Sequence, residues 1–578
     1  MFVTVKLLVV SSFNLFSLFF LSSMALAQSN PPSGITIPED TPDTIERTIP
    51  TPAKPLPSPI PSPPPSELLP DTPSQDSSPT IPSFTKPFKV KKILVEGVTV
   101  PKLDKLIREK TLILENSTVT FADLLQLRSE ITQLYIENKY VTSGAFIPNN
   151  QVINRNGATI TIKVVEGKLE DVEISGLSRL RKQYVRSRIA IAAKQPLNQE
   201  KLERALQLLQ LDPLIERVNA QLSAGKAPGQ SILKLDIKEA PPFHAGVFTQ
   251  NNQSPSIGSQ QSGAFIAHDN LLGFGDNLNL QYGITEGLDL YDINYKVPIN
   301  PRDGTINLRY SNTDSRIIEE PFQDTDIRSE AQTYSISYRQ PLNRIPEAEF
   351  ALELGLDLRR SQTFILNDIP FSFSEGPEDG ESKVKAIRFS QDSVKRNAKR
   401  VLAARSQFSV GINAFDATVN DSGTDARFFS WLGQFQWVER LSSKNLLLAR
   451  INAQLTPDSL LSLEKFSIGG INTVRGYSQN EIVSDNAVTA SVEARFPLTR
   501  NSNALQIAPF FDVATSWNNR TPNSNPQTLA GLGLGLIWQP SQDLNLRLDY
   551  GIPLIAIDDR GDTLQDNGIY FSLQYQPF

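Results

Sequence analysis

The stretch FALELGLDL, residues 350–358, alternates strictly between large apolar side chains and others. Every second residue is Phe or Leu, whereas Glu353 and Asp357 belong to the other parity. Because successive side chains of a β-strand point to opposite faces, the stretch predicts a strand with one apolar and one polar face. DNLNLQYGI at 276–284 and LNLRLDY at 544–550 repeat this pattern.

The same alternation runs through residues 242–578, with no helical pattern to interrupt it. The chain as a whole is 39% hydrophobic and 20% charged, a composition typical of soluble proteins. A membrane-spanning β-barrel with a wet lumen accounts for both facts, because only every second residue of its strands meets lipid. We therefore expect residues 242–578 to form a transmembrane antiparallel β-barrel in the outer membrane.

About sixteen alternating segments can be distinguished in this region, an even number, as is usual for such barrels. Their expected centres are Val247, Phe265, Leu280, Ile293, Leu308, Ile336, Leu354, Ile387, Val410, Phe435, Ile451, Val492, Phe510, Leu534, Leu546 and Leu573.

The connections between these segments alternate in length. Tight ones are expected at 273–276, 300–304, 442–444 and 499–502. The intervening connections are mostly long, at 315–332, 365–381, 416–427 and 456–486, although the one near Glu286 is short. Long loops on one face and short turns on the other are typical of outer-membrane barrels.

The amino-terminal region predicts export. Lys6 precedes an apolar run at 7–21, and Ala25-Leu26-Ala27 fits a cleavage site, so we expect residues 1–27 to be a signal peptide rather than a membrane anchor. Residues 28–87 are dense in proline and predict an extended, disordered linker. A proline-rich ligand for a partner domain is the alternative.

Between linker and barrel lies an internal repeat, at 88–167 and 168–241. Each copy has the order strand, helix, helix, strand, strand, and each opening strand ends at a glycine, Gly97 or Gly176. Thr120 is the expected N-cap of one helix. The repeat resembles polypeptide-transport-associated (POTRA) domains, which implies that an exposed sheet edge binds an extended client segment. The alternative is a pair of spacer domains.

The longest predicted external loop contains GGINTVRGYSQ, residues 469–479. Tandem POTRA-like domains, a sixteen-stranded barrel and VRGY in this loop together resemble the haemolysin secretion/activation transporters of two-partner secretion, across 88–578. VEARFPL at 492–498, DNLLGFGDNL at 269–278 and FFDVA at 510–514 support the resemblance. The expected site residues are Gly469, Gly470, Val474, Arg475, Gly476 and Tyr477.

The resemblance implies that this loop folds back into the lumen and that Arg475 pairs with Asp512 on the barrel wall. The residues agree, because Phe511 and Val513 share one parity and Asp512 must then face the lumen. A lone acid there needs a partner, and a guanidinium offers a two-point match. Gly476 permits a close backbone approach. A solvated loop arginine is the alternative reading of Arg475.

Composition argues against other classes of function. With no cysteine, two histidines and a net charge of -6, we expect no metal site, no cofactor and no nucleic-acid partner. Neither His244 nor His268 belongs to a recognisable triad, so we expect no enzyme. The terminal Phe578 after an alternating strand resembles the signal read by the outer-membrane assembly machinery.

We therefore expect an outer-membrane translocation pore whose periplasmic POTRA domains capture an unfolded exported polypeptide. The chain has no nucleotide-binding motif, so client folding outside would supply the driving force. Two alternatives stay open. One is an assembly factor that inserts other barrels, which usually has more POTRA domains; the other is a passive porin, which would lack them.

Overall fold

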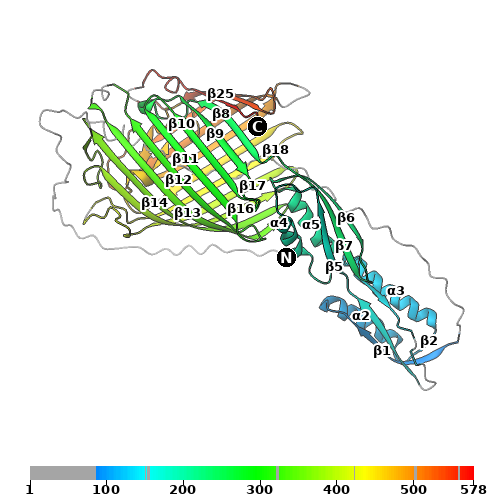
Figure 1. Cartoon of the computed structure of the whole chain (residues 1–578). Coiled ribbons are helices and arrows are strands. Elements are labelled where there is room, and N and C mark those ends of the chain that lie inside the picture. Colours follow the sequence, from blue (N-terminus) through cyan, green and yellow to red (C-terminus); the bar gives the residue numbers. More distant parts are fainter. Residues whose placement is uncertain are drawn as a thin grey trace.

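The computed structural model describes residues 86–149, 151–152, 157–320, 325–366, 368–421, 423–499, 504–557 and 560–578. The predicted signal peptide and nearly all of the predicted linker lie outside these residues. Within them, no helix is both long and apolar enough to cross a membrane. Figure 1 shows two small α+β units that extend from one end of a β-barrel.

The first unit comprises β1 (Phe88–Glu96), α2 (Pro101–Leu114), β2 (Thr118–Val119), α3 (Phe121–Glu137), β3 (Gly144–Phe146) and β4 (Ala158–Val165). Its sheet has the order β2-β1-β4-β3, with β1 parallel to β4. Both helices pack on this sheet through buried residues such as Leu103 and Ile131. Thr120 caps α3, as predicted: its side chain accepts from the N–H of Asp123, whose carboxylate accepts from the N–H of Thr120.

The second unit has the predicted order strand, helix, helix, strand, strand, and none of its described residues forms a strand that corresponds to β2. Its elements are β5 (Lys168–Ser175), α4 (Lys182–Ala192), α5 (Gln199–Gln210), β6 (Ile215–Ala224) and β7 (Gln230–Glu239), in the sheet order β5-β7-β6. The apolar spacing of SRLRKQYVRSRIAIA predicts a helix over 178–192, but α4 begins only at Lys182. The preceding turn is held instead by Glu239, whose carboxylate accepts from the N–H groups of Ser178, Arg179 and Leu180 at 2.7–3.0 Å.

The remaining chain closes into an antiparallel barrel of sixteen long strands, which confirms the predicted architecture. They are β8 (Phe243–Gln250), β9 (Gln261–Asp269), β10 (Asn277–Ile284), β11 (Leu288–Pro298), β12 (Thr305–Arg316), β13 (Arg328–Ile345), β14 (Ala348–Ile365), β16 (Glu381–Arg396), β17 (Arg400–Gly411), β18 (Phe429–Arg440), β19 (Leu446–Leu455), β22 (Asn486–Pro497), β23 (Leu505–Trp517), β24 (Thr528–Trp538), β25 (Leu544–Pro553) and β26 (Ile569–Tyr575). The two-residue β15 (Ile369–Pro370) extends one hairpin, and β26 pairs with β8 to close the ring.

The parity of a residue within its strand decides whether its side chain faces outward or into the lumen. Leu354 of the opening stretch is 57% exposed on the outer surface, and Ile293 is 42% exposed there. Inward-facing positions carry polar pairs instead, such as Arg309 with Asp292, whose Nη2 and Oδ2 atoms lie 2.7 Å apart. The barrel therefore presents an apolar wall outside and a charged wall inside, as a lipid-embedded channel requires.

The connections show the predicted asymmetry. Short turns join β11 to β12, β13 to β14 and β16 to β17, whereas 366–380, 412–428, 456–485 and 554–568 are long. Residues 500–503 lie outside the described part of the chain, so most of the tight connection expected at 499–502 does too.

The second α+β unit contacts the short turns of the barrel. The Nε of Arg188 donates to the Oδ1 of Asp303 at 3.1 Å, and Arg344 of β13 pairs with the same carboxylate. The N–H of Arg181 donates to the carbonyl of Gly273 at 3.1 Å, and its guanidinium lies over the ring of Phe274. The short-turn face therefore carries the α+β units (Figure 1).

Candidate functional site: an arginine anchor in the barrel lumen

The connection between β19 and β22, residues 456–485, is called loop 6 below. It contains a short 3-10 helix (Ser462–Glu464) and a hairpin of β20 (Phe466–Ile468) and β21 (Ile482–Ser484). Ile468, Val474 and Tyr477 are almost completely buried, in one cluster with Ala514 of β23 and Leu529 of β24. Loop 6 therefore packs against the inner wall rather than extending into water.

Two glycines form the turn that leads to the VRGY segment. Gly469 and Gly470 have φ angles of 103° and 89°, in the region that favours glycine. The N–H of Gly470 donates to the carbonyls of Val474 and Tyr477 at 3.1 and 3.0 Å. This tight turn places the side chain of Arg475 toward the wall.

Arg475 and Asp512 form a two-point ion pair. The Nε of Arg475 donates to Oδ2 of Asp512 at 2.7 Å, and its Nη2 donates to Oδ1 at 3.0 Å. The backbone N–H of Arg475 also donates to Oδ2, at 3.2 Å. Arg475 is 4% exposed and Asp512 1%. A buried bidentate pair of this kind fixes both position and orientation.

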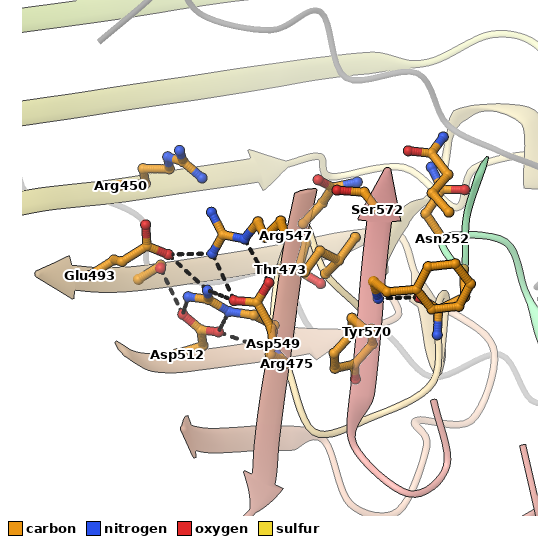
Figure 2. A pocket seen from close by; sticks show the side chains of 16 residues that line it. Asn252, Arg450, Thr473, Arg475, Glu493, Asp512, Arg547, Asp549, Tyr570 and Ser572 are labelled. Atoms are coloured by element: carbon orange, nitrogen blue, oxygen red, sulfur yellow. Dashed lines mark hydrogen bonds and ion pairs between the residues drawn. The ribbon is translucent and has the colours of Figure 1, made fainter. Parts of the chain in front are cut away.

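The guanidinium is surrounded by further wall groups (Figure 2). Its Nη1 donates to Glu493 of β22 at 2.8 Å and to Asp549 of β25 at 3.1 Å. The ring of Phe510 lies beneath it, with the Cζ atom 3.4 Å from the ring centroid. Arg547 donates to the same two carboxylates. The acids are thus shared between arginines, which offsets the cost of burying them.

The backbone after Arg475 lies directly on the wall at two strand glycines. A Cβ added to Gly531 would lie 2.0 Å from the carbonyl oxygen of Arg475, and one added to Gly551 would lie 2.5 Å from the nitrogen of Gly476. Gly476 itself has a φ of 108°. No larger residue fits at these strand positions without moving the loop.

Two tyrosines complete the attachment. The hydroxyl of Tyr477 lies 2.9 Å from the carbonyl oxygens of Ala530 and Ile555. The hydroxyl of Tyr570 on β26 accepts from the N–H of Gly476 at 2.9 Å and donates to the carbonyl of Tyr477. The VRGY segment is therefore bonded through backbone as well as side chains.

The structure brings together all the site residues that the sequence indicated. The sequence alone did not indicate that Glu493, Asp549, Arg547, Gly531 and Gly551 belong to the site. Strand parity was the available signal, since Glu493 stands between Val492 and Ala494, and Asp549 between Leu548 and Tyr550. Parity shows that a residue faces the lumen, but not that it meets a loop residue distant in the sequence.

The site holds a polar cavity of about 260 Å³, whose lining includes Arg475, Asp512, Arg450 and Asn252 (Figure 2). The described residues contain no group of three or more His, Asp or Glu side chains arranged to hold a metal ion. His244 pairs with Asp269, and His268 lies 3.0 Å from Arg179, both away from this site.

Known proteins resemble both parts of the chain. A family model for the POTRA domain, ShlB-type, matches residues 88–167, and one for the haemolysin secretion/activation protein ShlB/FhaC/HecB matches residues 229–537. The outer membrane transporter CdiB of Dickeya dadantii is 22% identical over 61% of this chain and 62% of that protein, slightly under two thirds of its length. The heme/hemopexin transporter protein HuxB of Haemophilus influenzae strain Rd is 21% identical over 78% and 76%.

Among solved structures, CdiB from Escherichia coli matches with a TM-score of 0.64 at 20% identity, over 87% of this chain and 93% of that one. This likeness shows the shared fold. The family model 229–537 spans more than half of the 578 residues. The chain therefore belongs to the haemolysin secretion/activation protein ShlB/FhaC/HecB family.

Proposed function

We propose that this chain is a pore of the bacterial outer membrane that secretes an unfolded polypeptide in two-partner secretion. The α+β units lie on the periplasmic side, because they adjoin the short turns, and the long loops face outward. The client's extended segment binds to a sheet edge of these units and then passes through the barrel. The buried Arg475–Asp512 anchor is the observation that carries this proposal.

The anchor supports transport because it gives loop 6 one defined position inside a charged lumen. A passive porin does not need a loop fixed by an ion-pair network, nor two α+β units at the short-turn end of its barrel. The side-chain contacts of Arg475 with described residues are hydrogen bonds and ion pairs to the wall. We therefore propose transport without an enzymatic step.

An assembly factor that inserts other barrels is the second candidate function. It would share the anchor and the α+β units. The match to a secretion family favours a secreted client over a membrane-inserted one. The two functions differ in where the client ends, which is the culture medium for one and the outer membrane for the other.

The test compares proteins of the culture medium and of the outer membrane between cells with the native chain, without it, and with Arg475→Ala. We expect one large polypeptide to disappear from the medium in the last two, while the Arg475→Ala barrel still inserts and shows heat-modifiable migration on gels. Loss of other barrels from the membrane instead would indicate assembly. Normal secretion by Arg475→Ala would overturn the proposed role of the anchor.

A further inference from the structure

Loop 6 has a second attachment inside the lumen, at Glu464, eleven residues before Arg475. The Nη2 of Arg388 donates to Oε1 and Oε2 of Glu464 at 2.8 and 3.0 Å. The Nη1 of Arg359 lies 3.0 Å from Oε1 and also donates to the carbonyl of Leu463. Glu464 and Arg359 are each 6% exposed.

The two attachments lie on different parts of the wall. Arg475 binds strands β22, β23 and β25, whereas Arg359 and Arg388 project from β14 and β16. Strands β17, β18 and β19 lie between β16 and β22 in the ring. The ion pairs of Glu464 therefore attach loop 6 to a part of the wall other than the part that holds Arg475.

The charges of the two attachments are opposite. At one, a loop cation binds wall acids; at the other, a loop acid binds wall arginines. The two attachments also differ in the hydrogen bonds and ion pairs that the wall residues keep when the loop is released. Arg388 retains Asp357, to which its Nε donates, and Ser409, to which its Nη1 donates at 2.8 Å. Arg359 would lose its bonds to Glu464 and Leu463, and Asp357 stands two residues away from it on the same face of β14.

The Arg475 attachment has no comparable replacement. Without Arg475, Asp512 keeps a bond from Ser491, whose neutral hydroxyl donates to Oδ1 of Asp512 at 2.7 Å. The backbone contacts at Gly531 and Gly551 would be lost as well. Leaving a buried carboxylate without its cation is strongly unfavourable. The Glu464 end is therefore the end that can be released at lower cost.

We propose that Glu464 is a gating contact: its ion pairs with Arg359 and Arg388 hold loop 6 in the lumen at rest and break when a client passes, while the Arg475 end stays docked. This inference rests on the proposed function. Leu460, Leu461 and Leu463 pack with Val384 and Phe428 beside the same contact. The gate thus combines an ion pair with an apolar patch, and neutralising Glu464 removes the first while leaving the second.

The test uses the full chain reconstituted in planar lipid bilayers in KCl solution. Glu464→Gln keeps the shape of the side chain but leaves both arginines without their loop carboxylate when the gate is closed. Because this destabilises the closed state relative to the open one, we expect the fraction of time in the open state to rise about tenfold or more. Secretion in cells should continue.

Glu439→Gln is the matched control. Glu439 is also 6% exposed and pairs with an arginine, Arg400, but lies at the periplasmic end of β18. Glu439→Gln should leave the open fraction unchanged. Arg388→Gln should also raise the open fraction, but less than Glu464→Gln, because Arg359 still pairs with Glu464. The double variant should open no more than Glu464→Gln alone, because that change already breaks the contact with Arg388.

Glu464→Gln opening no more than Glu439→Gln would overturn the gate, as would additive effects of Glu464→Gln and Arg388→Gln. So would loss of secretion in Glu464→Gln without increased opening, because Glu464 would then belong to a fixed anchor. Heat-modifiable migration on gels confirms that each variant is a folded barrel. Failure of the proposed function shows separately: no polypeptide would then disappear from the culture medium of cells that lack the chain.

Discussion

The Nε of Arg475 lies 2.7 Å from the Oδ2 of Asp512, although 37 residues separate them in the sequence. The pair joins a loop to an inward-facing strand position, and the backbone N–H of Arg475 reinforces it. Loop 6 is consequently part of the interior of the barrel.

Arg475→Lys should preserve the charge of this anchor but not its geometry. A lysine cannot make the two parallel bonds to Asp512 while also reaching Glu493 and Asp549. With about 1.5–3 kcal/mol expected for each lost charge-assisted hydrogen bond, we expect secretion to fall at least about tenfold. Quantitative immunoblotting of the secreted client measures this. Native-level secretion by the lysine variant would show that charge alone suffices.

Gly551→Ala tests the backbone contact without changing any charge. The added methyl group would lie 2.5 Å from the nitrogen of Gly476, so the loop must move away from β25. We expect secretion to be reduced as strongly as by Arg475→Lys. Gly355→Ala is the control, because the three atoms nearest to its methyl group all belong to β13, with Ser337 Cβ at 3.2 Å. Equal secretion by the two alanine variants would count against close docking of the loop.

Asp303→Ala tests how the second α+β unit is held on the barrel. It removes the carboxylate shared by Arg188 and Arg344, leaving two arginines side by side. We expect a broader distance distribution between spin labels on the second unit and on the barrel, measured by pulsed electron resonance. The chain has no native cysteine, so labelling is specific. An unchanged distribution would show that the contacts of Arg181 suffice.

Glu239 makes the second unit sensitive to acid. Burial opposes ionisation of this carboxyl, but the N–H groups of Leu180, Ser178 and Arg179 outweigh it and lower its pKa. A lowered pKa in the folded state means that the stabilisation is present above the ordinary glutamate pKa and is lost as the pH falls through the folded value. We expect faster amide exchange around α4 near pH 4 in the native chain.

The Glu239→Gln variant is the comparison for that measurement. It should show the faster exchange already at pH 7, with little further change on acidification. A native chain whose α4 exchange, corrected for the intrinsic effect of pH, does not change between pH 7 and pH 4 would contradict the assignment.

The sequence was sufficient to predict the strands but not the contacts between residues that are far apart in the sequence. Alternation places a residue on one face, so FALELGLDL and its counterparts predict the sixteen strands and their inward acids. The helix at 178–192 was predicted four residues too early, because Glu239, far along the chain, binds the turn before it. The same limit hid Glu464: a polar residue in a loop carries no periodic signal, and its partners Arg359 and Arg388 meet it only once the barrel closes.

Secretion through the barrel requires that the client pass through its lumen, and site-specific cross-linking measures this. A photoreactive amino acid is placed at Asn294, which faces inward on β11, or at the adjacent Ile293, which faces lipid. During active secretion, we predict cross-links to the secreted polypeptide from position 294 and none from position 293. Cross-links from 293 alone, or from neither position while the client reaches the medium, would contradict passage through the barrel.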